Sequence, residues 1–310
     1  MKTICITPIK NISGAFEKLD SITDLVYAPE ISYTELYNSL QSSNFECIFT
    51  NPNKQNFMLD KKLLENTSVK VICTASTGTN HIDKKYCEER GIGIICITKD
   101  YQVINKISST AEHTLSLMLS LIRHIPNSFH SVKDGNWDWE PYVGRQMNSL
   151  TIGIIGYGRL GKLMEKYCNA LDMTVKIHDP YEGYDDLNLV LRESDIISLH
   201  IHVTDETREM INKNTISKMV KKPYLINTSR GEVVNEDDII DALKSEDLQG
   251  YATDVIRDEF GDINNSKLVE ESMDPNMNII ITPHIAGMTK EAQEIAYHWA
   301  IDKLENKYYD

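Results

Sequence analysis

Short apolar runs alternate with amphipathic segments along most of this chain. In the first hundred residues the strand-like runs are KTICIT, ECIFT, KVICTAS and GIGIIC, at 2–7, 46–50, 70–76 and 91–96. A helical pattern occupies 82–91 and ends on a glycine, which is a frequent helix stop. Strands that alternate with helices predict an α/β fold with mainly parallel sheets.

A second series of apolar runs extends from residue 150 to about residue 284. Its six strand-like members are separated by helix-length segments: TIGIIG, TVKIHD, DIISLH, PYLINTS, GYATD and NIIITP. Six strands connected in this way are what a doubly wound dinucleotide-binding domain needs. The helical segment that follows is too short for a further domain, so we expect it to pack on the first one. The predicted domains are therefore 1–103 completed by 286–310, and 104–285.

A long apolar helix interrupts the alternation after residue 100. Ser109 and Glu112 fit a capping box, and a Leu- and Met-rich sequence continues as far as about Arg123. Because this helix is apolar on most faces, we expect it to be buried between domains or between subunits. The next loop carries Trp137 and Trp139, which we interpret as loop anchors or as parts of a subunit contact or a site lid.

Charge narrows the classes of partner. The chain of 310 residues has 46 acidic and 32 basic residues, a net charge of -14, and an otherwise ordinary globular composition. This balance disfavours nucleic acid and anionic membrane surfaces, since both reward a basic patch. We therefore expect a small-molecule partner, and local positive groups must capture that molecule if it is an anion.

The cysteines indicate a reducing compartment. None forms a CxxC pair or a ligand-like spacing, and several lie in apolar strand-like runs: Cys5, Cys47, Cys73, Cys87, Cys96 and Cys168. The N-terminal apolar run is too short for a signal peptide, and no stretch approaches the length of a membrane span. We expect a cytoplasmic protein without a bound metal.

The segment GYGRLG, residues 156–161, fits the dinucleotide-binding pattern G-x-G-x-x-G. A predicted strand precedes it and a helical segment follows. Gly156 would allow the tight turn, Gly158 would let the backbone approach a pyrophosphate, and Gly161 would let helix and strand pack closely. The alternative is a glycine turn that binds no ligand.

Asp179 ends the next strand, 23 residues after Gly156, close to the spacing expected for an acid that binds ribose. A carboxylate there accepts hydrogen bonds from both ribose hydroxyls and repels a 2′-phosphate. The residues that follow, Pro180, Tyr181 and Glu182, offer no arginine for such a phosphate. NAD is therefore favoured over NADP.

Three polar residues lie at or just beyond the carboxyl ends of predicted strands, where open α/β sheets collect ligands. Arg230 follows PYLINTS, Glu259 lies five residues after Asp254, and His284 follows NIIITP. Each has an ordinary alternative: a helix-capping arginine, a solvated glutamate, or a histidine with a structural role. Together at one edge of a nucleotide-binding sheet, they make a coherent acid–base site.

These motifs resemble the D-isomer-specific 2-hydroxyacid dehydrogenases, with the phosphoglycerate dehydrogenases as the most similar branch. The likeness runs from STGTNHID at 76–83 to HIAGMTKEAQ at 284–293, and is weaker before that. Its most specific parts are GIIGYGRLGK, SDIISLHIHVTDET, LINTSRGEVVNEDDI, DVIRDE and ITPHIAGMT. The resemblance implies two doubly wound parallel-sheet domains: a Rossmann NAD domain and a smaller, flavodoxin-like substrate domain. It also implies a homodimer.

The resemblance assigns roles to individual residues. It implies that Arg230, Glu259 and His284 are catalytic, and that the backbone of Thr77 and Gly78 receives the substrate carboxylate together with Arg230. The implied contacts to NAD are Gly156, Tyr157, Gly158, Arg159, Leu160, Gly161, Asp179, His200, Thr204, Thr228, Ser229, Asp254 and Gly287.

The implied chemistry agrees with the residue types. Arg230 can pair with the carboxylate of a 2-oxo acid and polarise its carbonyl. Hydride addition leaves an alkoxide, and His284 is the natural proton donor because imidazole titrates near neutrality. Glu259 would favour the imidazolium form and hold the ring. In the oxidation direction the same histidine, now neutral, would remove the hydroxyl proton.

Some positions depart from the family pattern. His202 and Phe260 stand where the family usually has proline. His202 is either a surface substitution or a cofactor contact. Because Phe260 follows Glu259, the loop that carries Glu259 can be placed differently from that of the family. The chain ends soon after its last helix, and we expect no regulatory domain of the kind that some phosphoglycerate dehydrogenases carry.

Several substrates and one other class of function stay open. D-3-phosphoglycerate, hydroxypyruvate and glyoxylate are candidate substrates, and a phosphorylated acid would need extra cations, for which Lys54, Arg123 and Arg145 are the candidates. Formate is disfavoured because formate enzymes have glutamine in place of Glu259, whereas phosphite oxidation stays possible. An NAD-sensing scaffold of the corepressor type is the non-enzymatic alternative.

Overall fold

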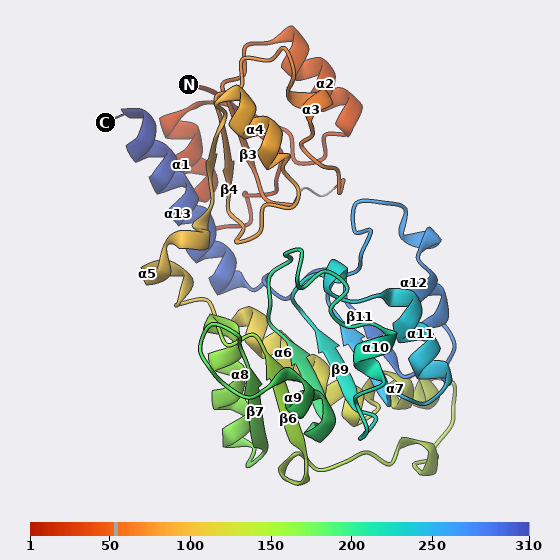
Figure 1. The fold of residues 1–310 in the computed structure, drawn as a ribbon. Helices are drawn as coiled ribbons and strands as arrows, with labels where there is room; N and C mark the ends of the chain where they lie inside the picture. Colours follow the sequence, from red (N-terminus) through yellow and green to blue (C-terminus); the bar gives the residue numbers. More distant parts are fainter. Residues whose placement is uncertain (53–54, 310) are drawn as a thin grey trace. The chain divides into compact units, whose positions relative to one another are not determined.

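The computed structural model describes residues 1–52 and 55–309 (Figure 1). Lys54, one of the candidate phosphate-binding cations, lies outside these residues. The chain divides into two compact units. The first contains 1–107 and 288–310, and the second contains 108–287. The chain therefore passes from one unit to the other between residues 107 and 108 and between residues 287 and 288. The domain boundaries predicted from the sequence were 103/104 and 285/286.

The first unit is built on a parallel sheet with the order β2-β1-β3-β4-β5. Its strands are β1 (Lys2–Cys5), β2 (Asp24–Tyr27), β3 (Cys47–Thr50), β4 (Val71–Thr74) and β5 (Gly93–Ile95). Its helices are α1 (Ala15–Ile22), α2 (Tyr33–Ser42), α3 (Lys61–Leu64), α4 (Lys84–Arg90), α5 (Tyr101–Ile104) and α13 (Lys290–Tyr309). The four predicted strands are confirmed.

The helix predicted at 82–91 is confirmed as α4. The Asp83 side chain accepts from the Tyr86 N–H and begins the helix, and Gly91 ends it at φ 69. Only a residue that tolerates the left-handed region serves well at such a stop.

The C-terminal helix α13 belongs to the first unit. It contacts α1 (Figure 1) and buries Tyr297, Ala300, Ile301 and Leu304 in the same core as Phe49. The hydroxyls of Tyr297 and Thr7 are hydrogen-bonded at 2.8 Å. The core of this unit is therefore assembled from segments at both ends of the sequence.

The second unit is built on a parallel sheet with the order β11-β10-β9-β8-β6-β7. Its strands, all predicted, are β6 (Thr151–Ile155), β7 (Thr174–His178), β8 (Ile196–Leu199), β9 (Tyr224–Asn227), β10 (Gly250–Thr253) and β11 (Ile279–Ile281). Its helices are α6 (Ser109–Ile122), α7 (Ile125–Lys133), α8 (Arg159–Ala170), α9 (Leu187–Glu193), α10 (Lys213–Ile216), α11 (Glu236–Lys244) and α12 (Lys267–Glu271).

The cap of α6 differs from the sequence prediction. The helix packs on β9, β10 and α8, so its apolar residues fill the core of the second unit itself. The predicted capping box is wrong, because Ser108 occupies the N-cap and its hydroxyl bonds the Glu112 carboxylate. The Ser109 hydroxyl is buried and has no hydrogen-bond partner in the part of the chain that the structure describes. A run of two serines and a threonine left the start of the helix ambiguous by one residue.

The segment that follows α6 leaves large apolar side chains exposed. Helix α7 has no buried residue, and Trp137 and Trp139 are 90% and 73% exposed. The interpretation of these tryptophans as loop anchors is therefore wrong, since an anchor must be buried. No helix in the described part of the chain is long and apolar enough to cross a membrane.

Candidate active site

The glycine loop joins β6 to α8 at the point where the strand order of the second sheet reverses. Gly156 has φ 94, and a Cβ there would lie 2.4 Å from the His200 carbonyl oxygen. A Cβ on Gly161 would lie 2.2 Å from the Gly156 carbonyl oxygen. A Cβ on Gly158 would meet no atom within 4 Å, so the space before the start of α8 is open. Two glycines close the turn, and the third leaves room for a ligand phosphate.

Asp179 lies beside this loop at the end of β7. Its carboxylate accepts from the backbone N–H of Tyr157 at 2.8 Å and from that of Tyr181 at 2.9 Å. Burial by itself would raise the pKa of Asp179, but these N–H groups and those of Glu182 outweigh it and lower the pKa. The carboxylate is therefore ionised at neutral pH, as a ribose-binding acid must be.

His200 lies at the end of β8, across the switch point from the glycine loop. Its Nε2 is 2.9 Å from the Ser198 hydroxyl, while its buried Nδ1 has no hydrogen-bond partner among the described residues. Burial lowers the pKa of His200 to about 4, so the ring is neutral at physiological pH. An unpaired ring nitrogen at this place fits a polar group of a bound dinucleotide.

Other predicted cofactor residues are more exposed. Thr204 is exposed and its hydroxyl is 3.1 Å from that of Thr207. His202 is also exposed, and Gly287 is exposed with open space at its Cβ position.

The loop after β9 presents Arg230. The Asn227 side chain fixes this loop, because its amide oxygen Oδ1 accepts from the Ser229 N–H and hydroxyl while its amide nitrogen donates to the Arg230 carbonyl at 2.9 Å. The Thr228 hydroxyl is buried against that of Thr114 at 2.7 Å. Thr228 and Ser229 therefore use their hydroxyls inside the protein.

The Arg230 guanidinium donates to the Ser229 carbonyl oxygen at 2.6 Å. Within residues 1–52 and 55–309, no carboxylate forms an ion pair with it. A half-buried guanidinium in this state suits an incoming anion.

His284 and Glu259 form the acid–base pair. The Glu259 carboxylate is 2.7 Å from Nδ1 of His284. Because an ionised carboxylate only accepts, the proton lies on Nδ1 and Nε2 is left to face a substrate. Burial would lower the pKa of His284, but the hydrogen bond and charge of Glu259, with the charge of Asp254, outweigh burial and the nearby Arg230 and raise it.

Asp254 holds the backbone of His284, which has φ 54 in the left-handed region. The His284 N–H donates to the Asp254 carbonyl at 3.0 Å, and the Asp254 carboxylate accepts from the N–H groups of Ile285 and Ala286 at 2.9 and 2.8 Å. These bonds offset the roughly 1–2 kcal/mol that such a conformation costs a non-glycine residue. Asp254, predicted as a cofactor contact, therefore positions the histidine that the sequence predicts to be catalytic.

His113 and Thr282 were not predicted as site residues. The Thr282 hydroxyl donates to the Asp254 carboxylate at 2.5 Å, and His113 Nε2 lies 3.0 Å from the Thr282 hydroxyl and 3.5 Å from Asp254. Burial would raise the pKa of Asp254, but the bonds from His113, Thr282 and the backbone lower it. A histidine on an otherwise apolar helix was the available signal for His113.

The candidate phosphate-binding cations of the second unit lie at the wrong edge of its sheet. Arg145 pairs with Asp195 at 3.4 Å, and the same carboxylate accepts from the Thr151 N–H at the amino end of β6. Arg123 ends α6, where the Leu121 carbonyl meets Asn278, just before β11. Arg230 lies at the carboxyl edge, so the predictions for Arg123 and Arg145 are wrong.

Thr77 and Gly78 belong to the first unit, in the loop after β4. The Thr98 hydroxyl donates to the Thr77 carbonyl at 2.5 Å, and the Ser76 hydroxyl donates to that of Gly78 at 2.6 Å. Both carbonyls are thus occupied, which leaves N–H groups as the polar backbone atoms that the loop can offer to a carboxylate.

The second unit therefore brings together, at one sheet edge, an open glycine loop, an ionised acid beside it, an arginine that pairs with no carboxylate of the described residues, and a histidine–glutamate pair. This set can bind a dinucleotide and an organic anion and can transfer one proton. Among the described residues, no group of three or more histidine, cysteine or acidic side chains is arranged to hold a metal ion.

Comparison with known proteins agrees with this geometry. Residues 115–286 match the family model described as D-isomer specific 2-hydroxyacid dehydrogenase, NAD binding domain. D-3-phosphoglycerate dehydrogenase of Bacillus subtilis (strain 168) is 35% identical over 237 residues, which is 73% of this chain and 43% of that protein. Glycerate dehydrogenase of Methylorubrum extorquens is 34% identical over 245 residues, 76% of this chain and 75% of that protein.

A solved structure of D-lactate dehydrogenase from Aquifex aeolicus, complexed with NAD and lactic acid, has TM-score 0.81 at 29% identity, covering 100% of this chain and 96% of that one. The chain spans about two fifths of the length of the phosphoglycerate dehydrogenases that it matches. The family match covers more than half of the residues, and the chain belongs to the D-isomer specific 2-hydroxyacid dehydrogenase family.

Proposed function

We propose that this protein is an NAD-dependent oxidoreductase that interconverts a small D-2-hydroxy acid and its 2-oxo acid. The observation that carries the proposal is the 2.7 Å contact between His284 Nδ1 and the Glu259 carboxylate, at the sheet edge that also presents Arg230.

The residues around the glycine loop would hold the cofactor. The start of α8 offers backbone N–H groups to a pyrophosphate, and Asp179 offers an ionised carboxylate to a ribose. His200, Thr204 and Gly287, the loop residues Tyr157, Arg159 and Leu160, and the backbone at Thr228 and Ser229 complete the proposed contacts. When bound, NAD supplies or accepts the hydride.

His284 would transfer the proton at Nε2. In reduction the imidazolium donates to the developing alkoxide, and in oxidation the neutral ring takes the hydroxyl proton. Glu259 stabilises the imidazolium and fixes the tautomer. Asp254 holds the backbone beside His284 in the left-handed conformation in which the ring contacts Glu259.

Arg230 would bind the substrate carboxylate and polarise the adjacent carbonyl. We assign the N–H groups at Thr77 and Gly78 a part in receiving that carboxylate, and we assign substrate binding to the first unit. The names of relatives include glycerate dehydrogenase, glyoxylate reductase and hydroxypyruvate reductase. Hydroxypyruvate and glyoxylate are the substrates we place first, because the second unit's candidate phosphate-binding cations lie at the opposite sheet edge.

The experiment is a panel of 2-oxo acids with NADH, followed by loss of absorbance at the NADH band. We expect turnover with at least one short acid, with NADH preferred over NADPH because of Asp179. 3-Phosphohydroxypyruvate in the same panel decides whether a phosphorylated substrate is accepted. Absence of turnover with every acid, or activity only with phosphite and NAD, contradicts the proposal.

The exposed apolar side chains of 125–143 support a homodimer. Ile125, Phe129 and Val132 of α7 are each more than half exposed, and Trp137 and Trp139 follow them. Apolar surface of this kind is typical of an interface. Sedimentation should give a dimer, and Trp137→Ser with Trp139→Ser should weaken it. We also propose the cytoplasm as the compartment, since all six cysteines are free thiols.

A further inference from the structure

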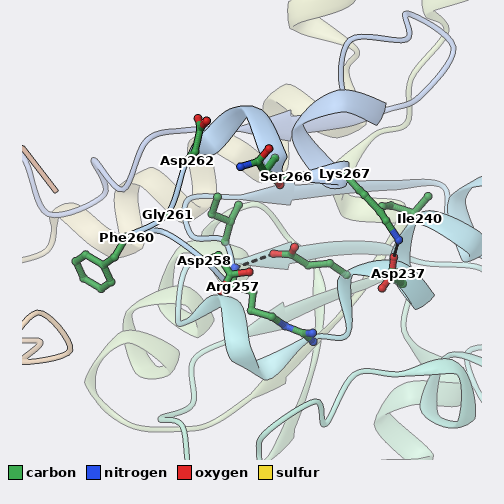
Figure 2. Close-up of a pocket in the computed structure, with 12 residues that line it drawn as sticks. Asp237, Ile240, Arg257, Asp258, Phe260, Gly261, Asp262, Ser266 and Lys267 are labelled. Carbon is green, nitrogen blue, oxygen red and sulfur yellow. Dashed lines mark hydrogen bonds and ion pairs between the residues drawn. The ribbon is translucent and has the colours of Figure 1, made fainter. Parts of the chain in front are cut away.

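The loop that carries Glu259 has an open space behind it. Residues 254–262 connect β10 to the segment before α12 without regular secondary structure. A pocket of about 550 Å³, lined by Ile240, Ile256, Arg257 and Phe260 among others, lies beside this loop (Figure 2). Close packing therefore does not hold the loop on that side, and individual polar contacts must do so.

Two of these contacts converge on Arg257, two residues before Glu259. Its backbone N–H donates to the Glu236 carboxylate at 2.8 Å, from the first turn of α11. Its guanidinium pairs with Glu209 at 2.5 Å. The backbone and the side chain of one residue are thus tied to two different segments of the second unit.

A third contact ties the same loop to the one that carries Arg230. A Cβ on Gly231 would lie 2.0 Å from the carbonyl carbon of Ile256 and 2.4 Å from the Arg257 nitrogen. The backbone of the Glu259 loop therefore runs against Gly231, directly after Arg230. A shift of Arg257 would move the loop relative to both catalytic side chains.

We propose that Glu236 and Arg257 are positioning residues that fix the Glu259 carboxylate against His284. The proposal rests on the proposed function for its catalytic meaning. Neither residue touches the reacting atoms. Their effect passes through the Glu259–His284 distance, which decides how strongly the imidazolium is stabilised.

The charges around both groups are few. His284 faces Glu259, Asp254 and Arg230. Glu236 faces Arg257, Asp258 and Asp237, and burial raises its pKa despite the Arg257 N–H and charge. Loss of Glu236 removes an acceptor for the Arg257 N–H and leaves the charges beside His284 in place. A change in the pKa of His284 would then indicate that the Glu259 carboxylate has been displaced.

The neighbouring residue on α11 provides a matched control. Asp237 pairs with Lys267 at 2.8 Å at the edge of the same pocket (Figure 2), and both side chains are exposed, at 67% and 73%. Exposed pairs of this kind contribute little to stability. Asp237→Ala removes a carboxylate one position from Glu236 without touching the Glu259 loop.

The test compares Glu236→Ala, Glu236→Gln, Arg257→Ala and Asp237→Ala in the full chain. Two quantities are measured: the pH titration of the His284 ring by NMR in the free protein, and the pH profile of kcat with the acid that the wild type reduces. Glu236→Ala should lower the pKa of His284 toward its ordinary value, shift the alkaline fall of kcat to lower pH, and reduce kcat about tenfold.

Glu236→Gln should restore the wild-type titration, because its amide oxygen still accepts from Arg257, and Asp237→Ala should leave both measurements unchanged. Arg257→Ala should shift His284 in the same direction and tests the proposal even if Glu236→Ala does not fold. An unshifted His284 titration in folded Glu236→Ala or Arg257→Ala overturns the inference. The titration needs no turnover, so an inactive wild type would contradict the proposed function separately.

Discussion

The two units of this protein have sheets with the same strand order and different residues at matching positions. Counted along each unit, the strands are arranged 2-1-3-4-5 in the first, and the second extends this order with a sixth strand. Equivalent loops can therefore be compared strand by strand. The carboxyl ends of the strands receive ligands in such sheets, so differences there bear directly on function.

The turn after the first strand shows the largest difference. In the second unit the chain passes from β6 to α8 through Gly156 and Gly158 and leaves open space at Gly158. In the first unit the longer loop before α1 buries Ile9 and Ile12 in the core. Gly14 begins α1 in the left-handed region. Of the two equivalent loops, the one before α8 carries the glycine pattern that suits a phosphate.

The turn after the fourth strand shows a likeness. Arg230 is the third residue after β9, and Thr77 is the third residue after β4. In both loops a polar side chain holds the carbonyl of that third residue, from Asn227 in one case and Thr98 in the other. Strand order assigns the place for a ligand, and the side chains decide whether chemistry or only binding occurs there.

The largest expected effect comes from removing the chemistry of the second unit. His284→Ala should lower kcat by about 10³-fold, because general acid–base catalysis contributes roughly 10²–10⁴-fold. Arg230→Ala should mainly raise the substrate KM.

The pH dependence of the wild type tests the same assignment. Reduction should slow as pH rises through the raised pKa of His284, since the imidazolium is the donor, and oxidation should show the opposite trend. Steady-state kinetics checks both, and full turnover by His284→Ala would contradict the assignment.

The turn after the third strand offers the next test, since His200 follows β8 where Asn51 follows β3. The pKa of His200 is about 4, below its ordinary 6.5, so the unfolded chain binds the proton more readily. The contribution of neutral His200 to the free energy of unfolding is therefore fully present above pH 6.5 and decreases as the pH falls toward 4. At pH 4 the loss is roughly 3 kcal/mol. His200→Asn should remove this loss in urea unfolding.

The exposed His130 serves as the control for that experiment, because His130→Asn removes a histidine without changing the buried surroundings of His200. Parallel stability curves for the wild type and His200→Asn between pH 7 and pH 4.5 would refute the buried, neutral state of His200.

Single substitutions at Gly158 and Gly14 should distinguish the N-terminus of α8 from that of α1, with a smaller effect than the changes above. Gly158→Ala should weaken NAD binding by about tenfold, because the methyl group occupies the space for the phosphates, while the free energy of unfolding stays the same. Gly14→Ala should leave NAD binding alone and cost about 1 kcal/mol, since Gly14 has φ 71. Calorimetric titration with NADH and thermal melts measure the two effects. Equal NAD affinity in Gly158→Ala would remove the distinction between the units.

The smallest expected effect concerns the loop of Thr77. Thr98→Val removes the hydroxyl that holds the Thr77 carbonyl and should raise the substrate KM about threefold with kcat unchanged, a loss below 1 kcal/mol. Thr98→Ser keeps the hydroxyl and should behave as the wild type. An unchanged KM in Thr98→Val would leave the first unit without support for its proposed part in carboxylate binding.

Local patterns predicted most strands and the residues of the candidate site because both lie in contiguous sequence signals. Strand β2 was missed because Asp24–Tyr27 is an edge strand that alternates half-buried and exposed residues, with no fully buried apolar run. Arg145 was misassigned because sequence gives a charge without saying which edge of the sheet it lies on. His113 was missed because its partners, Asp254 and Thr282, are more than 140 residues away.

The sequence by itself determined the alternation of strands and helices, the glycine turn with its acidic partner, and the identities of Arg230, Glu259 and His284. These features depend on residue type and on spacing within short segments, so local sequence patterns are enough to predict them. Only the tertiary structure decided three contacts. Asp254 accepts hydrogen bonds from the backbone that follows His284, Gly231 lies too close to Ile256 to carry a side chain, and Arg257 bonds the Glu259 loop to Glu236. Each of those requires two segments distant in sequence to meet within a few ångströms, and no local pattern records such a meeting.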